Sequence, residues 1–136
     1  MKNMFKEGST ILLPIFLILI SGILGCGNKT TAYTYEQITA KEAKEIMEKE
    51  TGYLILDVRT EEEYVTGHIE NAILIPDYEI EARAEAELTD KEQMILVYCR
   101  SGRRSKGVAE KLAEMGYCNV KEFGGIIDWS YGVVTE

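Results

Sequence analysis

The chain of 136 residues is poor in the side chains on which many catalytic and metal sites depend. It has one histidine, His68, and three cysteines, which form neither a Cys-X-X-Cys pair nor a cluster with histidine. Structural zinc and thioredoxin-like chemistry therefore lack residues at the required spacing. A Ser-His-Asp triad has little support from a single histidine. The net charge of −8 also argues against non-specific binding of nucleic acid.

The first residues have the features of a targeting segment. Two lysines precede an apolar run over residues 11–20, as in a signal peptide. The run is followed by Ile23-Leu24-Gly25-Cys26, which resembles a bacterial lipobox with isoleucine where leucine is usual. In a lipobox the cysteine is lipidated and becomes the mature N-terminus. The alternatives are an uncleaved anchor and plain secretion, because the length of the run does not decide whether it spans a membrane.

These features divide the chain into three parts. We expect a signal peptide over residues 1–25, a lipid-anchored Cys26 with a short polar tether over residues 26–34, and one domain over residues 35–136. The lipid would hold the domain at the cell membrane, facing the extracytoplasmic side. The length suits one domain with a short appendage. We expect a monomer.

Beyond the tether, segments with strand and helix patterns alternate. Apolar runs predict strands over residues 53–58, 73–75, 95–98 and 117–123. Helical patterns follow over residues 39–50, 61–65, 77–87, 103–115 and 126–129. The pair Gly124-Gly125 is expected to end the last strand. This alternation favours a single α/β domain with a largely parallel sheet.

The most informative stretch is residues 94–105. Its apolar half predicts a buried strand that ends on Cys99, and Gly102 allows a tight turn before the following helix. Amides of the loop and of the first helical turn then point into one concavity, to which the helix dipole adds positive charge. Such surroundings lower a cysteine pKa from about 8.5 to roughly 3.5–7.5. The sequence therefore predicts a nucleophilic thiolate inside an anion-binding loop, and the alternative is an inert buried cysteine.

Positive charge is concentrated at this loop in an otherwise acidic chain. Arg100, Arg103 and Arg104 follow Cys99 within five residues. We expect these arginines to attract an anionic substrate, whereas the alternative is a solvated basic face of the helix.

Three segments resemble the rhodanese (sulfurtransferase) family in the order in which that family has them. The loop segment is Val97-Tyr98-Cys99-Arg100-Ser101-Gly102-Arg103-Arg104-Ser105. It is preceded by Asp57-Val58-Arg59, which leads to Gly67-His68-Ile69, and followed by Gly124-Gly125-Ile126 before Trp129. The chain departs from the family at Glu70 and Asn71, where proline and glycine are common, but asparagine still permits a positive φ. The resemblance covers about residues 35–131.

The resemblance implies a three-layer α/β domain, with a central, largely parallel sheet flanked by helices. It implies a sulfurtransferase in which Cys99 takes a sulfane sulfur from a small anionic donor such as thiosulfate and passes it to a thiol or to cyanide. The loop residues Arg100, Ser101, Gly102, Arg103 and Arg104 would bind the substrate and stabilise the persulfide. No metal or organic cofactor is implied.

The same resemblance gives Asp57 and Arg59 supporting roles near the loop, although Arg59 can equally be exposed after a strand-end turn. We expect His68 to be structural, because a thiolate of low pKa needs no separate base. Cys118 is expected to be an inert small residue rather than a resolving thiol.

Two other functions stay open. Cysteine phosphatases and arsenate reductases also use a cysteine in an anion-binding loop, but they typically have an arginine six residues after it, where this chain has Ser105. A non-catalytic module that carries a persulfide or binds a partner is the second alternative.

Overall fold

The computed structural model describes residues 34–136. The predicted signal peptide, Cys26 and nearly all of the tether lie outside these residues. Within residues 34–136, no helix combines the length and the apolar character needed to cross a membrane.

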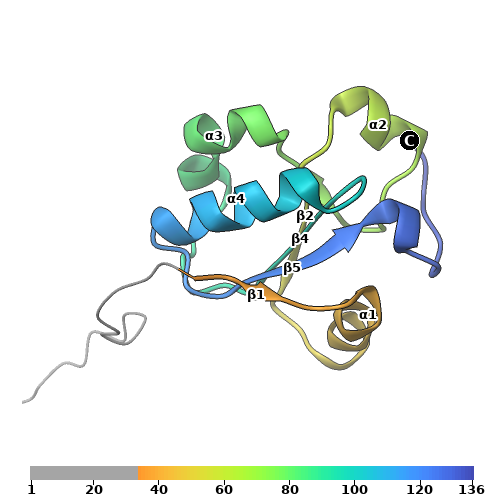
Figure 1. Cartoon of the computed structure of the whole chain (residues 1–136), viewed down its shortest axis with the longest axis horizontal. Coiled ribbons are helices and arrows are strands. Elements are labelled where there is room, and N and C mark those ends of the chain that lie inside the picture. The colour runs from red at the N-terminus through yellow and green to blue at the C-terminus, as the bar shows by residue number, and fades with distance from the viewer. Residues whose placement is uncertain (1–33) are drawn as a thin grey trace, which may run out of the picture.

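The described residues form one parallel five-stranded sheet with helices on both faces (Figure 1). The strand order is β1-β5-β4-β2-β3, and every strand pair is parallel. The strands are β1 (Glu36–Gln37), β2 (Leu54–Asp57), β3 (Ile73–Leu74), β4 (Ile95–Cys99) and β5 (Val120–Gly125). The α-helices are α1 (Ala40–Lys49), α2 (Glu61–Thr66), α3 (Ile80–Glu87) and α4 (Arg103–Glu114), and the 3₁₀ helices are η1 (Asp77–Glu79) and η2 (Ile126–Asp128). The α/β class and the three layers predicted from the sequence are confirmed.

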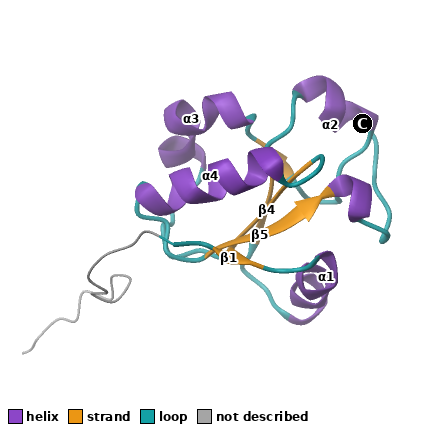
Figure 2. Cartoon of the chain, in the orientation of Figure 1, coloured by secondary structure: helices purple, strands orange, loops and turns teal. Residues whose placement is uncertain are grey.

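Helices α3 and α4 cover one face of the sheet, and α1 covers the other (Figure 2). All five residues of the central strand β4 are buried, and their side chains alternate between two apolar clusters. Val97 and Cys99 belong to the cluster that packs under α3 and α4. Leu96 and Tyr98 belong to the cluster that includes Ala43 of α1. The sulfur of Cys99 therefore lies on the α4 side of the sheet.

Two helix starts follow the sequence pattern closely. Thr39 and Thr60 each cap a helix, and each forms a reciprocal capping box with the glutamate three residues later. Asn71 has a φ of 66°, as its place in the turn before β3 requires.

The strands differ from the sequence prediction in two places: one strand was missed, and the bounds of another were wrong. The short edge strand β1 was not expected, because two exposed polar residues carry no periodic pattern. Strand β5 begins at Val120 rather than at residue 117, and it continues through Gly124 and Gly125. The reason is a register shift against β4, where Val97 pairs with Glu122 but Cys99 pairs with Gly125. A bulge lets the glycines stay in the sheet.

Candidate active site

Cys99 lies at the carboxyl end of the central strand, where a parallel sheet presents its ligands. Only 1% of the residue is exposed, so the sulfur is at the bottom of the loop that joins β4 to α4. Gly102 has a φ of 95° and precedes the first residue of α4. Its left-handed conformation turns the chain sharply, and its N–H donates to Cys99 Sγ at 3.0 Å.

Several donors converge on this sulfur. The Ser105 hydroxyl lies 3.4 Å from Sγ. Burial raises the pKa of the Cys99 thiol, but hydrogen bonds from the Ser105 hydroxyl and from backbone N–H groups at Ser105, Gly102 and Ser101 outweigh it, so the pKa lies below its ordinary value. This arrangement favours the thiolate more than the surroundings of an ordinary cysteine do.

The three arginines after Cys99 have different surroundings. Arg100 and Arg103 are exposed, and Arg103 lines a surface cleft of about 560 Å³ between α4 and the η1–α3 segment. Arg104 is partly buried and is close enough to Cys99 for the thiolate charge to raise the pKa of Arg104, although the hydrogen bond from Arg104 to Glu63 is the larger cause. Among residues 34–136, Arg100 and Arg103 are therefore exposed cations outside any ion pair, and Arg104 is fixed by its ion pair with Glu63.

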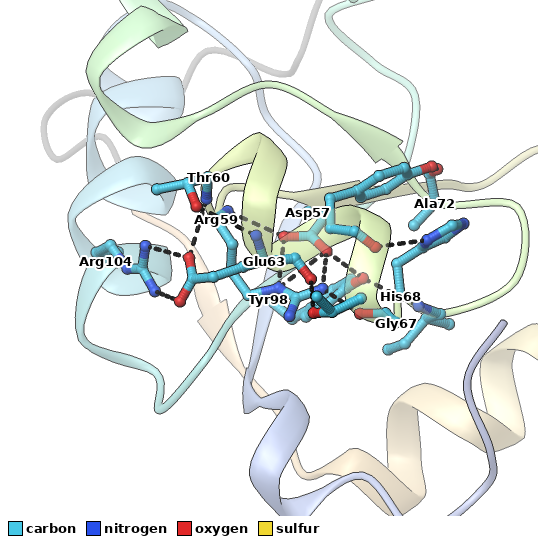
Figure 3. Close-up of polar contacts among 12 residues, drawn as sticks. Asp57, Arg59, Thr60, Glu63, Gly67, His68, Ala72, Tyr98 and Arg104 are labelled. Carbon is cyan, nitrogen blue, oxygen red and sulfur yellow. Dashed lines mark hydrogen bonds and ion pairs between the residues drawn. The ribbon is translucent and has the colours of Figure 1, made fainter. Parts of the chain in front are cut away.

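Arg104, the arginine that is fixed, joins two helices. Arg104 of α4 donates to both carboxylate oxygens of Glu63 in α2, at 2.8 and 2.9 Å (Figure 3). Glu63 also accepts from the Thr60 N–H as part of its capping box. The hydrogen bond from Arg104 is the main cause that lowers the pKa of Glu63 to about 2. Helix α2 is thereby tied to the start of α4, beside the loop.

This ion pair predicts a stability difference that depends on pH. Glu63→Gln keeps an acceptor for the Thr60 N–H but loses the charge, so we expect a loss of about 1 kcal/mol near neutral pH. Because the folded pKa of about 2 is below the unfolded value of about 4.3, the wild-type advantage is complete above pH 5 and disappears as the pH falls through 4.3 towards 2. Urea unfolding of both proteins from pH 7 to pH 2.5 measures it. A difference that stays constant over this range would contradict the pairing.

Asp57 and Arg59 form a buried network with Tyr98 (Figure 3). Arg59 donates to Asp57 from Nε at 3.0 Å and from Nη2 at 2.7 Å, and Nη2 also donates to the carbonyl of Gly67 at 2.7 Å. The Tyr98 hydroxyl donates to Asp57 Oδ2 at 2.6 Å. Because Tyr98 and Cys99 point to opposite faces of the sheet, this network lies on the face opposite the sulfur. Tyr98 connects the network to Cys99 only as its neighbour in β4.

Within residues 34–136, neither His68 nor Cys118 lies against Cys99. The His68 ring stacks on Tyr64 at a centroid distance of 3.7 Å, and its backbone pairs with Val134. Cys118 precedes Val120, which pairs with Ile95 at the amino end of β4, whereas Cys99 is at the carboxyl end. The parallel sheet thus separates Cys118 from Cys99 by the length of a strand, so Cys118 is not placed to resolve a Cys99 persulfide within the same molecule.

Sequence reasoning gave no role at the sulfur site to Glu63, Ser105 and Glu122, although Ser105 belongs to the loop segment that resembles the family. Glu122 is 2% exposed and accepts from the Ser105 hydroxyl at 2.6 Å. The sequence signal for Glu122 was the alternation of side chains along β5. Val120 and Glu122 lie on the same face of this strand, and Val120 belongs to the core, so the Glu122 carboxylate occupies a core position.

Comparison with known proteins agrees with this geometry. The Rhodanese-like domain family matches residues 39–131. The thiosulfate sulfurtransferase PspE of Escherichia coli is 41% identical over 73 residues, which cover 54% of this chain and 70% of PspE. The thiosulfate sulfurtransferase GlpE of Coxiella burnetii is 36% identical over 96 residues, which cover 70% of this chain and 87% of GlpE.

Solved structures show the same fold. A rhodanese-related protein from Thermoplasma volcanium is 32% identical with a TM-score of 0.65, over 75% of this chain and 100% of that chain. A rhodanese from Escherichia coli with anions is 36% identical with a TM-score of 0.56, over 62% of this chain and 99% of that chain.

Proposed function

Because this chain belongs to the Rhodanese-like domain family, we propose that it is a sulfurtransferase in which Cys99 carries the transferred sulfur as a persulfide. The observation that carries the proposal is the convergence of the Gly102 N–H and the Ser105 hydroxyl on Cys99 Sγ. These donors stabilise negative charge on sulfur, first on the thiolate and then on the persulfide. Two relatives named thiosulfate sulfurtransferase support the same class of reaction.

The reaction has two steps. The Cys99 thiolate attacks the outer sulfur of thiosulfate, an S–S bond forms, and the bond to the inner sulfur breaks with its electron pair leaving on sulfite. A thiol acceptor, or cyanide in an assay, then takes the outer sulfur and regenerates the thiolate. The deep position of Sγ favours a donor that presents one small terminal sulfur atom.

The substrate-binding role that we propose for the loop divides among its residues. Arg100 and Arg103 are exposed and attract the anionic donor over a distance of about one Debye length. Arg104 is fixed by Glu63 and adds charge beside the thiolate. Ser101 and Gly102 supply amides to the sulfur. Asp57 and Arg59 support the site by fixing Tyr98, the residue before the nucleophile.

We also propose that Cys26 is lipidated and that the lipid holds the domain on the extracytoplasmic side of the cell membrane. The support is the lipobox-like sequence that ends in Cys26 and the apolar run before it. In that location the sulfur donor and the acceptor would be small molecules or proteins outside the cytoplasm.

The persulfide step can be tested by mass spectrometry of the full chain, purified in detergent and incubated with thiosulfate. We expect the wild type and Cys118→Ser to gain one sulfur atom, and Cys99→Ser to gain none. Cys118→Ser is the matched control, because it removes a cysteine sulfur at the opposite end of the sheet.

If the wild type gains no sulfur while Cys99 can still be alkylated, thiosulfate is not the donor, and a non-catalytic module becomes the better hypothesis.

Cysteine phosphatase chemistry is disfavoured for this site. The sixth residue after the cysteine is Ser105, whose hydroxyl contacts Sγ and Glu122 rather than an oxyanion. Release of phosphate from an aryl phosphate by wild type but not by Cys99→Ser would reverse this preference.

A further inference from the structure

Glu122 is a buried carboxylate that the sulfur-transfer steps do not use. It lies in the middle of β5, opposite Val97 of β4, and points to the face that α4 covers. Its neighbours in that row are the core residues Val120 on the same strand and Val97 on the next. An acidic side chain in such a row requires compensation, because burial of an unpaired charge is costly.

The compensation is not an ion pair. Within residues 34–136, no lysine, arginine or histidine forms an ion pair with Glu122. Its Oε1 accepts from the Gly124 N–H at 2.8 Å and from the Ser105 hydroxyl at 2.6 Å. The carboxylate is thus held by one backbone amide and one hydroxyl, and that hydroxyl also faces the nucleophile.

Ser105 has one hydroxyl proton and more than one acceptor. Its Oγ lies 2.6 Å from Glu122 Oε1, 3.4 Å from Cys99 Sγ, 3.1 Å from the carbonyl of Gly102 and 3.4 Å from that of Gly124. When Glu122 is ionised, the short contact takes the proton, and the sulfur loses a donor. When Glu122 is protonated, it donates to Ser105 Oγ, and the hydroxyl proton is released to stabilise the thiolate.

We propose that Glu122 is the proton acceptor for the Cys99 thiol and that Ser105 relays the proton. The thiol proton passes to Ser105 Oγ while the Ser105 proton passes to Glu122 Oε1. One S–H bond breaks, one carboxyl O–H bond forms, the hydroxyl is restored, and the total charge stays −1. The pair therefore shares one proton between sulfur and carboxylate, and the Cys99 thiolate is accompanied by a neutral Glu122.

Other charged groups surround the pair. Arg104 of α4 lies close to Cys99 and favours the thiolate. Tyr35, before β1, has a pKa that is raised by burial and then by the charges of Glu122 and Glu110. Neither of these groups donates a hydrogen bond to Glu122, so Ser105 is the side chain that couples the carboxyl to the sulfur.

The inference rests on the nucleophilic thiolate of the proposed function, and it is tested without any sulfur donor. Alkylation of Cys99 by iodoacetamide is followed against pH in wild type and Glu122→Gln. The neutral amide keeps the size of the side chain and removes the second charge. For Glu122→Gln we expect alkylation to rise with pH in a single step. Its midpoint should lie about one pH unit below that of the wild type, because the coupled carboxyl of Glu122 raises the wild-type midpoint and broadens the wild-type profile. Glu110→Gln removes an exposed charge from α4 and should leave the midpoint unchanged.

The location of the proton is read in the wild type by infrared difference spectroscopy at neutral pH. Alkylation removes the negative charge on sulfur, so Glu122 should ionise, and a protonated-carboxyl C=O band should disappear. Glu122→Gln should lack that band. An unchanged alkylation midpoint in a folded Glu122→Gln overturns the proposal, as does a wild-type spectrum without the band. Failure to transfer sulfur from thiosulfate would leave both readouts intact and would count only against the proposed donor.

Discussion

Gly125→Ala is expected to lower sulfur transfer by roughly 100-fold while the domain still folds, because a displacement of about 1 Å at a reacting group has an effect of that order. A Cβ at Gly125 would lie 2.1 Å from the carbonyl oxygen of Arg100 and 2.6 Å from Cα of Ser101. These are backbone atoms of the loop that presents the amides to Cys99, so the loop must move away from the sulfur. Steady-state rates with thiosulfate and cyanide measure the loss, and circular dichroism checks the fold.

Gly107→Ala is the matched control. Gly107 lies within α4, and a Cβ there meets nothing within 4 Å. Alanine in a helix interior is favoured over glycine by roughly 0.5–1 kcal/mol, so this variant should be more stable and equally active. If Gly107→Ala were as inactive as Gly125→Ala, the defect would come from added bulk in general rather than from the contact with Arg100. Wild-type rates in Gly125→Ala would show that the loop position does not limit the reaction.

The strand, loop and helix around Cys99 could be predicted because the signals are local. A run of apolar residues ends at Cys99, a glycine with positive φ follows, and the apolar positions of α4 recur at helical spacing. Capping at Thr39 and Thr60 was equally readable, because a capping box spans only four residues.

The partners of the loop could not be predicted, because they depend on contacts between residues far apart in the chain. Glu63 precedes Arg104 by 41 residues, and Glu122 follows Ser105 by 17. Their approach is set by the strand order and by the bulge that shifts the β4–β5 register. A single sequence shows neither feature, so Arg104 was expected to be free for substrate and Glu122 drew no attention.

The position of Asp57 illustrates a related limit. The resemblance placed Asp57 and Arg59 near the loop, but it did not say on which side of the sheet. Because Asp57 pairs with Tyr98 in register, its side chain shares the face of Tyr98 and not that of Cys99. Successive side chains of β4 point to opposite faces of the sheet. A residue that contacts the Tyr98 side chain therefore lies on the face opposite the Cys99 sulfur and does not contact that sulfur directly.

Arg59→Met is expected to lower the free energy of unfolding by about 3–5 kcal/mol, the usual cost of removing one partner of a buried ion pair. Arg59 is 5% exposed and Asp57 is fully buried, so the substitution leaves the Asp57 charge without its cation. The carbonyl of Gly67 loses its donor as well. Since small domains have about 5–15 kcal/mol in total, unfolding should begin at a much lower urea concentration.

Arg83→Met provides the comparison, because Arg83 also pairs with carboxylates, Glu79 and Glu87, but its side chain is 38% exposed. Solvent screens these pairs, so we expect a loss below about 1 kcal/mol. Adding Asp57→Asn to Arg59→Met should recover part of the larger loss, because asparagine removes the unpaired charge. Its Oδ1 still accepts from the backbone N–H of residue 59, and its Nδ2 can donate to the Tyr98 hydroxyl in place of the bond that this hydroxyl donates to Asp57. Recovery of stability in the double variant would assign the cost to the buried charge. Without recovery, the cost would belong to the lost packing of Arg59 and to its lost bond with Gly67, and the network would depend on the shape of Arg59 rather than on its charge.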